Sequence, residues 1–180
     1  GDRGEFERVR ARLKVMACPK CSRRATLILN GLARGYCAGS CTRRHVRGHR
    51  VLCSSRRRAP KGCGKSFMVH CCRYVPRLQY RTSTLWSFLQ ALAGGRGVGE
   101  AFALSGLHRS MRTVCRLMAC LRRSLPGIRT QLLRYWATPP PLASGGNEIT
   151  HTVIHIRVAV TATTCPLAQM QLRSQQPLTL

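Results

Sequence analysis

The chain has 180 residues, enough for one ordinary domain or two small ones. Its 31 lysines and arginines stand against five acids, and so large a positive excess destabilises a compact state unless a polyanion such as DNA or RNA neutralises it. Because the sequence contains no long apolar run, it predicts no membrane-spanning helix, and residues 1–14 lack the apolar core of a signal peptide.

The composition divides the chain into four stretches. Residues 1–16 are a charged, basic lead-in that we expect to be flexible. Cysteine and arginine dominate residues 17–73, which we interpret as a zinc-ribbon-like module, and residues 80–136 show helical periodicity. Residues 137–180 begin with a proline- and glycine-rich linker and continue as a tail.

Residues 17–73 hold eight of the eleven cysteines and few long apolar runs. Such a segment does not build a sufficient hydrophobic core and needs a metal or a similar staple. The odd cysteine count and the missing secretion signal weigh against a disulfide framework, so close cysteine pairs favour metal binding.

The most specific signal is Cys18-Pro19-Lys20-Cys21. Two thiolates separated by two residues can hold one zinc ion from a tight turn whose backbone amides donate to the sulfurs. A second pair is needed to complete a tetrahedral site. We therefore predict Zn²⁺ as a cofactor of this segment.

Two cysteine pairs compete for the second half of the site. Cys37 and Cys41 follow at close to the usual separation of zinc-ribbon pairs, but the gap between them is one residue too long. Cys53 and Cys63 come later, and residues 62–67 are typical of the exit from a zinc knuckle, with a glycine after the last cysteine and an aromatic residue to pack on the site.

We prefer the later pair because strands over residues 27–31 and 46–52 can bring the two knuckles together. Cys37 and Cys41 then lie at the tip of the hairpin, where they offer a second, weaker site with two histidines, His45 and His49. The predicted zinc ligands are Cys18, Cys21, Cys53 and Cys63.

Residues 80–136 predict short helices joined by tight turns. Thr82 or Ser83 is expected to cap the first helix, which ends at Gly94-Gly95, and the second helix covers residues 98–104 before a Ser105-Gly106 turn. The apolar stripe of the first helix is Leu85, Phe88, Leu89 and Leu92, at helical spacing.

A longer helix is expected from Arg109 to Arg123, stopped by Pro126-Gly127, with a last short helix over residues 128–136. Its predicted apolar stripe is Met111, Val114, Met118 and Leu121. Three or four short helices with tight turns are typical of a helix-turn-helix fold. In the tail, residues 150–164 are rich in Val, Ile and Thr, which favour a strand, and we expect a disordered segment or a loosely attached hairpin.

Three motifs carry a resemblance to a known group: Cys18-Pro19-Lys20-Cys21, Cys63-Gly64-Lys65-Ser66-Phe67 and Ala101-Phe102-Ala103-Leu104-Ser105-Gly106. With them, residues 18–134 resemble the N-terminal part of bacterial insertion-sequence transposases, although the second knuckle is stretched and the turn after Gly106 is about two residues longer than usual. The resemblance implies recognition of transposon ends or a regulatory role derived from it. It also implies a cytoplasmic, nucleoid-associated bacterial protein that works with a separate catalytic transposase.

Arginines supply the candidate nucleic-acid contacts. Arg109, Arg112 and Arg116 share one face of the predicted long helix, away from its apolar stripe, so this helix can enter a major groove. The cluster Arg56-Arg57-Arg58 is suited to phosphate contacts that do not depend on sequence.

A catalytic site is not expected, because strand transfer needs two or three carboxylates that hold metal ions. Beyond the lead-in, only Glu100 and Glu148 are available. We therefore predict a small α+β protein, with zinc-ribbon hairpins followed by a helix-turn-helix-like segment, that binds nucleic acid without catalysis and prefers double-stranded DNA. The alternatives are a ribosomal-type, RNA-associated zinc-ribbon protein and a transposon remnant without function.

Overall fold

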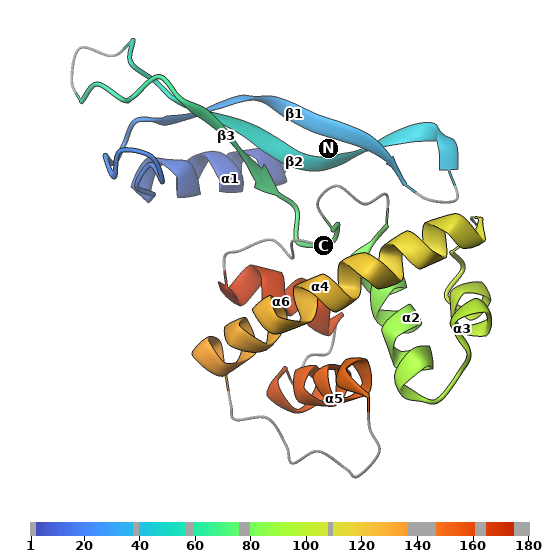
Figure 1. The fold of residues 1–180 in the computed structure, drawn as a ribbon. Helices are drawn as coiled ribbons and strands as arrows, with labels where there is room; N and C mark the ends of the chain where they lie inside the picture. The colour runs from blue at the N-terminus through green and yellow to red at the C-terminus, as the bar shows by residue number, and fades with distance from the viewer. Residues whose placement is uncertain are drawn as a thin grey trace. The chain divides into compact units, whose positions relative to one another are not determined.

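The computed structural model describes residues 3–37, 40–56, 60–75, 80–107, 110–136, 147–160 and 165–174; within these ranges, the side chains of residues 3–6, 37, 40–43 and 172–174 are not described. The fold is a small α+β arrangement of a three-stranded sheet and helices (Figure 1). In chain order the elements are α1 (Arg3–Val15), β1 (Leu27–Cys37), β2 (Ser40–Cys53), β3 (Ser66–His70), α2 (Thr82–Ala93), α3 (Val98–Leu104), α4 (Met111–Tyr135), α5 (Glu148–Ala159) and α6 (Pro166–Ser174).

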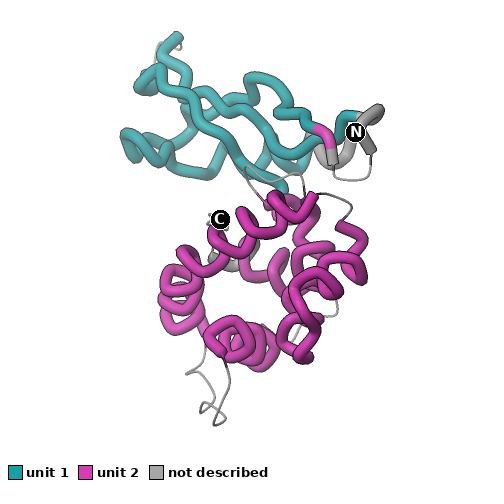
Figure 2. Tube along the Cα trace, turned by 45° about the vertical axis from the view of Figure 1, so that its right-hand side comes forward, with its two compact units in different colours: residues 1–35, 44–71 teal, residues 36–43, 72–180 magenta. Residues whose placement is uncertain are grey.

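The chain forms two compact units (Figure 2). Residues 1–35 and 44–71 make unit 1, and residues 36–43 and 72–180 make unit 2. Unit 1 contains α1 and most of the sheet, and unit 2 contains the helices from α2 to α6.

The sheet of unit 1 has the strand order β1-β2-β3. The strands predicted over residues 27–31 and 46–52 are confirmed, and both extend further toward the hairpin tip. β3 was not predicted; it pairs antiparallel with β2, from Gly48 opposite His70 to Leu52 opposite Ser66. A side chain at Gly48 would meet the carbonyl oxygen of Val69 at 2.5 Å, so glycine permits this strand pairing.

Helix α1 corrects the expectation of a flexible lead-in. Residues 3–15 are helical, and Leu13, only 3% exposed, is buried in the small core of unit 1 with Leu27 and Val51. Val9, one helical turn earlier, packs against the same cluster. This segment has few apolar residues among many charged ones, so the sequence shows no clear helical repeat. Its contact with the sheet nevertheless stabilises the helix.

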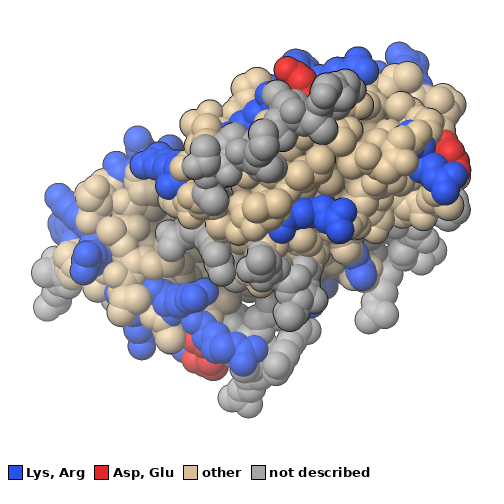
Figure 3. Space-filling model, turned by 90° about the horizontal axis from the view of Figure 1, so that it is seen from below, with Lys and Arg blue, Asp and Glu red and all other residues tan. Residues whose placement is uncertain are grey.

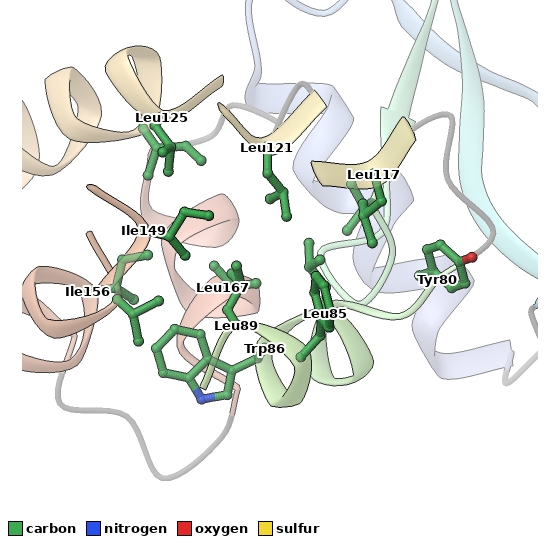
Figure 4. Close-up of a cluster of buried hydrophobic side chains, with 14 of the residues drawn as sticks. Tyr80, Leu85, Trp86, Leu89, Leu117, Leu121, Leu125, Ile149, Ile156 and Leu167 are labelled. Carbon is green, nitrogen blue, oxygen red and sulfur yellow. The ribbon is translucent and has the colours of Figure 1, made fainter. Parts of the chain in front are cut away.

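Unit 2 is built around one hydrophobic core to which α2, α3, α4, α5 and α6 all contribute. In Figure 4 the labelled side chains of α2, such as Leu85 and Leu89, point toward Leu121 of α4 and Leu167 of α6. The predicted end of α2, the limits of α3 and the burial of Leu85, Phe88 and Leu89 are confirmed. The predicted cap of α2 is wrong, because Thr82 is already inside the helix and Arg81 occupies the cap position without a side-chain hydrogen bond. Gly106 has a φ of 68°, which explains why glycine follows α3.

The predicted end of helix α4 is wrong, because the helix continues through Pro126 to Tyr135 instead of ending near Arg123. The predicted stripe is right except for Met111, which is 60% exposed. Leu125 continues the same buried face up to Pro126, which itself is exposed, and Ile128 and Leu132 extend this face beyond it. Their burial outweighs the roughly 3 kcal/mol that an interior proline costs a helix.

The tail also differs from the expectation. Residues 148–159 form helix α5 rather than a strand, and Ile149, Val153 and Ile156 are buried in the core of unit 2. Asn147 caps this helix by accepting a hydrogen bond from the amide of Thr150 at 2.9 Å. Together with Leu167 and Met170, which lie in α6, this part of the tail is packed. β-branched residues fit a helix here because its apolar positions repeat with helical spacing.

None of the helices in the described ranges combines the length and the hydropathy that crossing a bilayer requires.

Replacing Leu132 tests whether α4 packs beyond Pro126. Leu132 is fully buried, so Leu132→Ala should destabilise unit 2 by about 2–5 kcal/mol, whereas Leu133→Ala, at a neighbouring residue that is 54% exposed, should change stability by less than about 0.5 kcal/mol. Both tryptophans, Trp86 and Trp136, belong to unit 2, so urea unfolding followed by tryptophan fluorescence reports this unit. Equal stability of the two variants would contradict a continuous packed helix.

Candidate metal centre

The first knuckle is a tight turn over residues 17–24. An isolated bridge pairs Ala17 with Arg24, and the amide of Ser22 donates to the carbonyl of Cys18 at 2.8 Å. Ser22 has a φ of 58°, the left-handed conformation that turns the chain back. The amide of Lys20 lies 3.4 Å from the sulfur of Cys18 and donates to it, as expected of a turn that presents thiolates to a metal.

The second knuckle begins where β2 ends. The amide of Cys53 donates to the carbonyl of Lys65 at 3.0 Å, and the amide of Gly64 donates to the carbonyl of Cys53 at 2.9 Å. Gly64 has a φ of 71°, so glycine after the last cysteine permits the tight turn, as predicted. Phe67 packs against the cluster of unit 1 that contains these cysteines, which was also expected.

Gly62 makes room for the sulfur of Cys53. A Cβ atom at this position would lie 2.5 Å from that sulfur and 2.6 Å from the carbonyl oxygen of Ser54. The amide of Cys63 then donates to the sulfur of Cys53 at 3.2 Å. The second knuckle therefore depends on a glycine before its last cysteine as well as on the one after it.

Contacts between residues far apart in sequence join the two knuckles. The amide of Ser54 donates to the carbonyl of Thr26 at 2.8 Å, and the guanidinium of Arg23 donates to the carbonyl of Lys61. The hydroxyl of Thr26, which is fully buried, lies 3.2 Å from the sulfur of Cys53. Sequence reasoning did not identify Thr26, because nothing in its local sequence marks it as a neighbour of a ligand.

Four sulfurs converge at this point. The sulfurs of Cys18 and Cys63 are 3.9 Å apart, those of Cys21 and Cys53 are 3.8 Å apart, and all four lie within 4.8 Å of one another. A tetrahedral ion with metal–sulfur bonds of about 2.3 Å has sulfur–sulfur edges of about 3.8 Å. The four cysteines are free of disulfides, and Cys18 and Cys53 are buried. The arrangement can therefore hold one metal ion, with the ligand set that the sequence favours.

The surroundings of Cys53 favour its thiolate. Burial by itself raises the pKa of this thiol. Hydrogen bonds from Thr26 and from the amide of Cys63 lower the pKa by more than burial raises it, so the pKa falls from 9.0 to about 7. The thiolate is the form that binds a metal.

The predicted arginine contacts and the alternative metal ligands are not among the four clustered cysteines. Arg56 is exposed beside the second knuckle, and Arg112 and Arg116 are exposed on α4. The side chains of Cys37 and Cys41, and all of Arg57, Arg58 and Arg109, lie outside the described residues. His49, considered for a second site, is 7% exposed, and its Nδ1 atom has no hydrogen-bond partner among the described residues.

Replacing Gly62 tests the second knuckle without removing a ligand. Gly62→Ala should weaken metal retention about tenfold or more, because the added methyl group displaces Cys53, at a cost of about 1–3 kcal/mol. Competition with a chromogenic chelator measures this retention. As a control, Gly99→Ala places its methyl group in open space on α3 and should leave retention unchanged. Wild-type retention in Gly62→Ala would contradict this geometry.

Comparisons with protein-family models, curated proteins and solved structures find no match to this chain.

Proposed function

We propose that this chain is a zinc-stabilised, non-catalytic protein that binds double-stranded DNA through helix α4. The main support for this function is that Arg112 and Arg116 are exposed one helical turn apart, on the face of α4 opposite its buried stripe. A helix with one packed face and one arginine face can enter the major groove and contact phosphates and guanine edges.

Zinc is the metal that best fits the cysteine cluster. Four thiolates are soft ligands, and a closed tetrahedral sulfur site is typical of structural zinc. Since all four positions are supplied by the chain, no coordination site is left open for a water molecule or a substrate. The proposed zinc therefore holds the knuckles together and takes no part in a reaction.

The charge distribution supports an anionic partner. Three acids have described side chains, and each lies near an arginine: Glu7 is 3.9 Å from Arg10, Glu100 is 2.8 Å from Arg96, and Glu148 is 3.9 Å from Arg129. Helix α4 contains no acid. Lys and Arg side chains are spread over the face drawn in Figure 3, whereas acidic side chains occupy small patches. Binding to phosphates would relieve this excess of positive charge.

The order of helices α2, α3 and α4, with the Gly106 turn before α4, favours duplex DNA over structured RNA. This order also fits the helix-turn-helix interpretation and the motif-based resemblance to transposase N-terminal regions. With so few carboxylates and each described one beside an arginine, metal-assisted strand transfer would have to come from a separate catalytic subunit.

The double variant Arg112→Ala/Arg116→Ala tests the proposed DNA contact. Losing two phosphate or base contacts should weaken binding to a labelled duplex about tenfold or more in an anisotropy titration. The control Arg8→Ala/Arg157→Ala removes the same charge from exposed positions on α1 and α5 and should have a smaller effect. Unchanged affinity in the α4 variant, together with weaker binding by Arg56→Ala, would move the interface to unit 1. Equal competition by structured RNA at all salt concentrations would contradict the preference for DNA.

A further inference from the structure

The arginines of α4 form a row that runs along nearly the whole helix. Arg123 and Arg134 are exposed like Arg112 and Arg116, and they follow Arg112 by 11 and 22 residues. At about 100° per residue, all four side chains fall within an arc of about 40° on the helix surface. We define the α4 row as Arg112, Arg116, Arg123 and Arg134.

This row lies directly opposite the buried stripe. Val114, Leu121, Leu125 and Leu132 face the core of unit 2, about half a helical turn away from the row. The row exists because α4 continues through Pro126. A helix that ended near Arg123 would not have carried Arg134 onto the same face.

Small residues separate the arginines of the row. Ala119, Gly127 and Thr130 are exposed and lie on or beside the same arc, between the second arginine and the last. The hydroxyl of Thr130 donates to the carbonyl of Pro126 at 3.0 Å, so this side chain folds back onto the helix. A polyanion can therefore approach the helix backbone closely along the row.

No described carboxylate neutralises the row. The three described acids pair with arginines outside it. Among the described residues, Arg123 makes long contacts, at 3.4 Å to the carbonyl of Ala119 and 3.5 Å to the sulfur of Cys120, and the Arg134 guanidinium lies 5.5 Å from the centre of the Tyr135 ring. These contacts orient the two guanidinium groups but do not balance their charge.

We infer that the α4 row is a phosphate-binding track for about ten base pairs of duplex DNA, an inference that rests on the proposed function and deepens it. Twenty-two residues of α-helix span about 33 Å, which matches ten base pairs at about 3.4 Å each when α4 runs along the duplex axis and crosses the groove. A straight helix of this length cannot stay within a groove that winds around the duplex. Arg123 and Arg134 therefore meet phosphates, and their contribution to affinity does not depend on sequence.

The test compares Arg123→Ala/Arg134→Ala with the wild-type chain on hairpin-closed duplexes of about 6 and about 14 base pairs. On the longer duplex the variant should lose about 1.8 from the slope of log affinity against log salt, since each phosphate contact contributes about 0.9. Raising salt from about 50 to about 200 mM should then weaken the wild-type complex about tenfold more than the variant complex. On the shorter duplex, which cannot reach the whole row, the difference should be much smaller.

The control Arg8→Ala/Arg157→Ala removes two exposed arginines outside the row and should lower the slope equally on both duplexes, if it lowers it at all. A wild-type slope for Arg123→Ala/Arg134→Ala on the longer duplex, or an equal loss on both lengths, would overturn the track. If Arg112→Ala/Arg116→Ala still weakened binding, the proposed DNA contact would survive that result. A wild-type chain that binds neither duplex would overturn the proposed function and the track together.

Discussion

Unit 1 depends on the meeting of four cysteine sulfurs, because little else holds its parts together. Among its described residues, the buried apolar side chains of the core are Leu13, Leu27 and Val51 besides two of the cysteines, and a few partly buried apolar side chains pack against them. So few apolar side chains do not offset the conformational entropy lost when a segment of this length folds. A metal ion at the centre of the sulfurs would join the turn after α1 to the end of β2 and to the loop that follows it. The free energy of metal binding would then stabilise the folded state of unit 1.

Unit 2 does not share this dependence. Its core brings together side chains from five helices, and Phe88 and Phe102 add an edge-to-face ring contact at 6.2 Å between ring centres. A core of this kind supports the long helix α4 through an interior proline. The packing of one face of α4 therefore keeps the helix continuous, and this continuity places the arginines of the opposite face in a single row. The same helix contributes to the core of unit 2 and to the proposed interface.

Local sequence signals predicted the structure correctly where a single short motif determines it. The Cys18-Pro19-Lys20-Cys21 turn, the glycine after Cys63 and the apolar spacing of α2 each predicted their local structure, and the strands between the knuckles led to the preferred four cysteines. The sequence failed where tertiary packing overrides local preference. Pro126 signalled a helix end, and the β-branched residues of α5 signalled a strand, but burial against the core of unit 2 makes both segments helical. Thr26 and Gly62 act through residues brought close only by the fold.

We propose that one zinc ion holds unit 1 together, and native mass spectrometry of the purified chain, before and after chelation, is the experiment that decides it. We expect one zinc per chain, and we expect chelation to remove the strand signal in circular dichroism while the fluorescence of Trp86 and Trp136 in unit 2 stays unchanged. The substitutions Cys18→Ser and Cys21→Ser should each abolish zinc retention. A chain without zinc, or one that loses zinc and keeps its strand signal, would show that zinc does not hold unit 1 together.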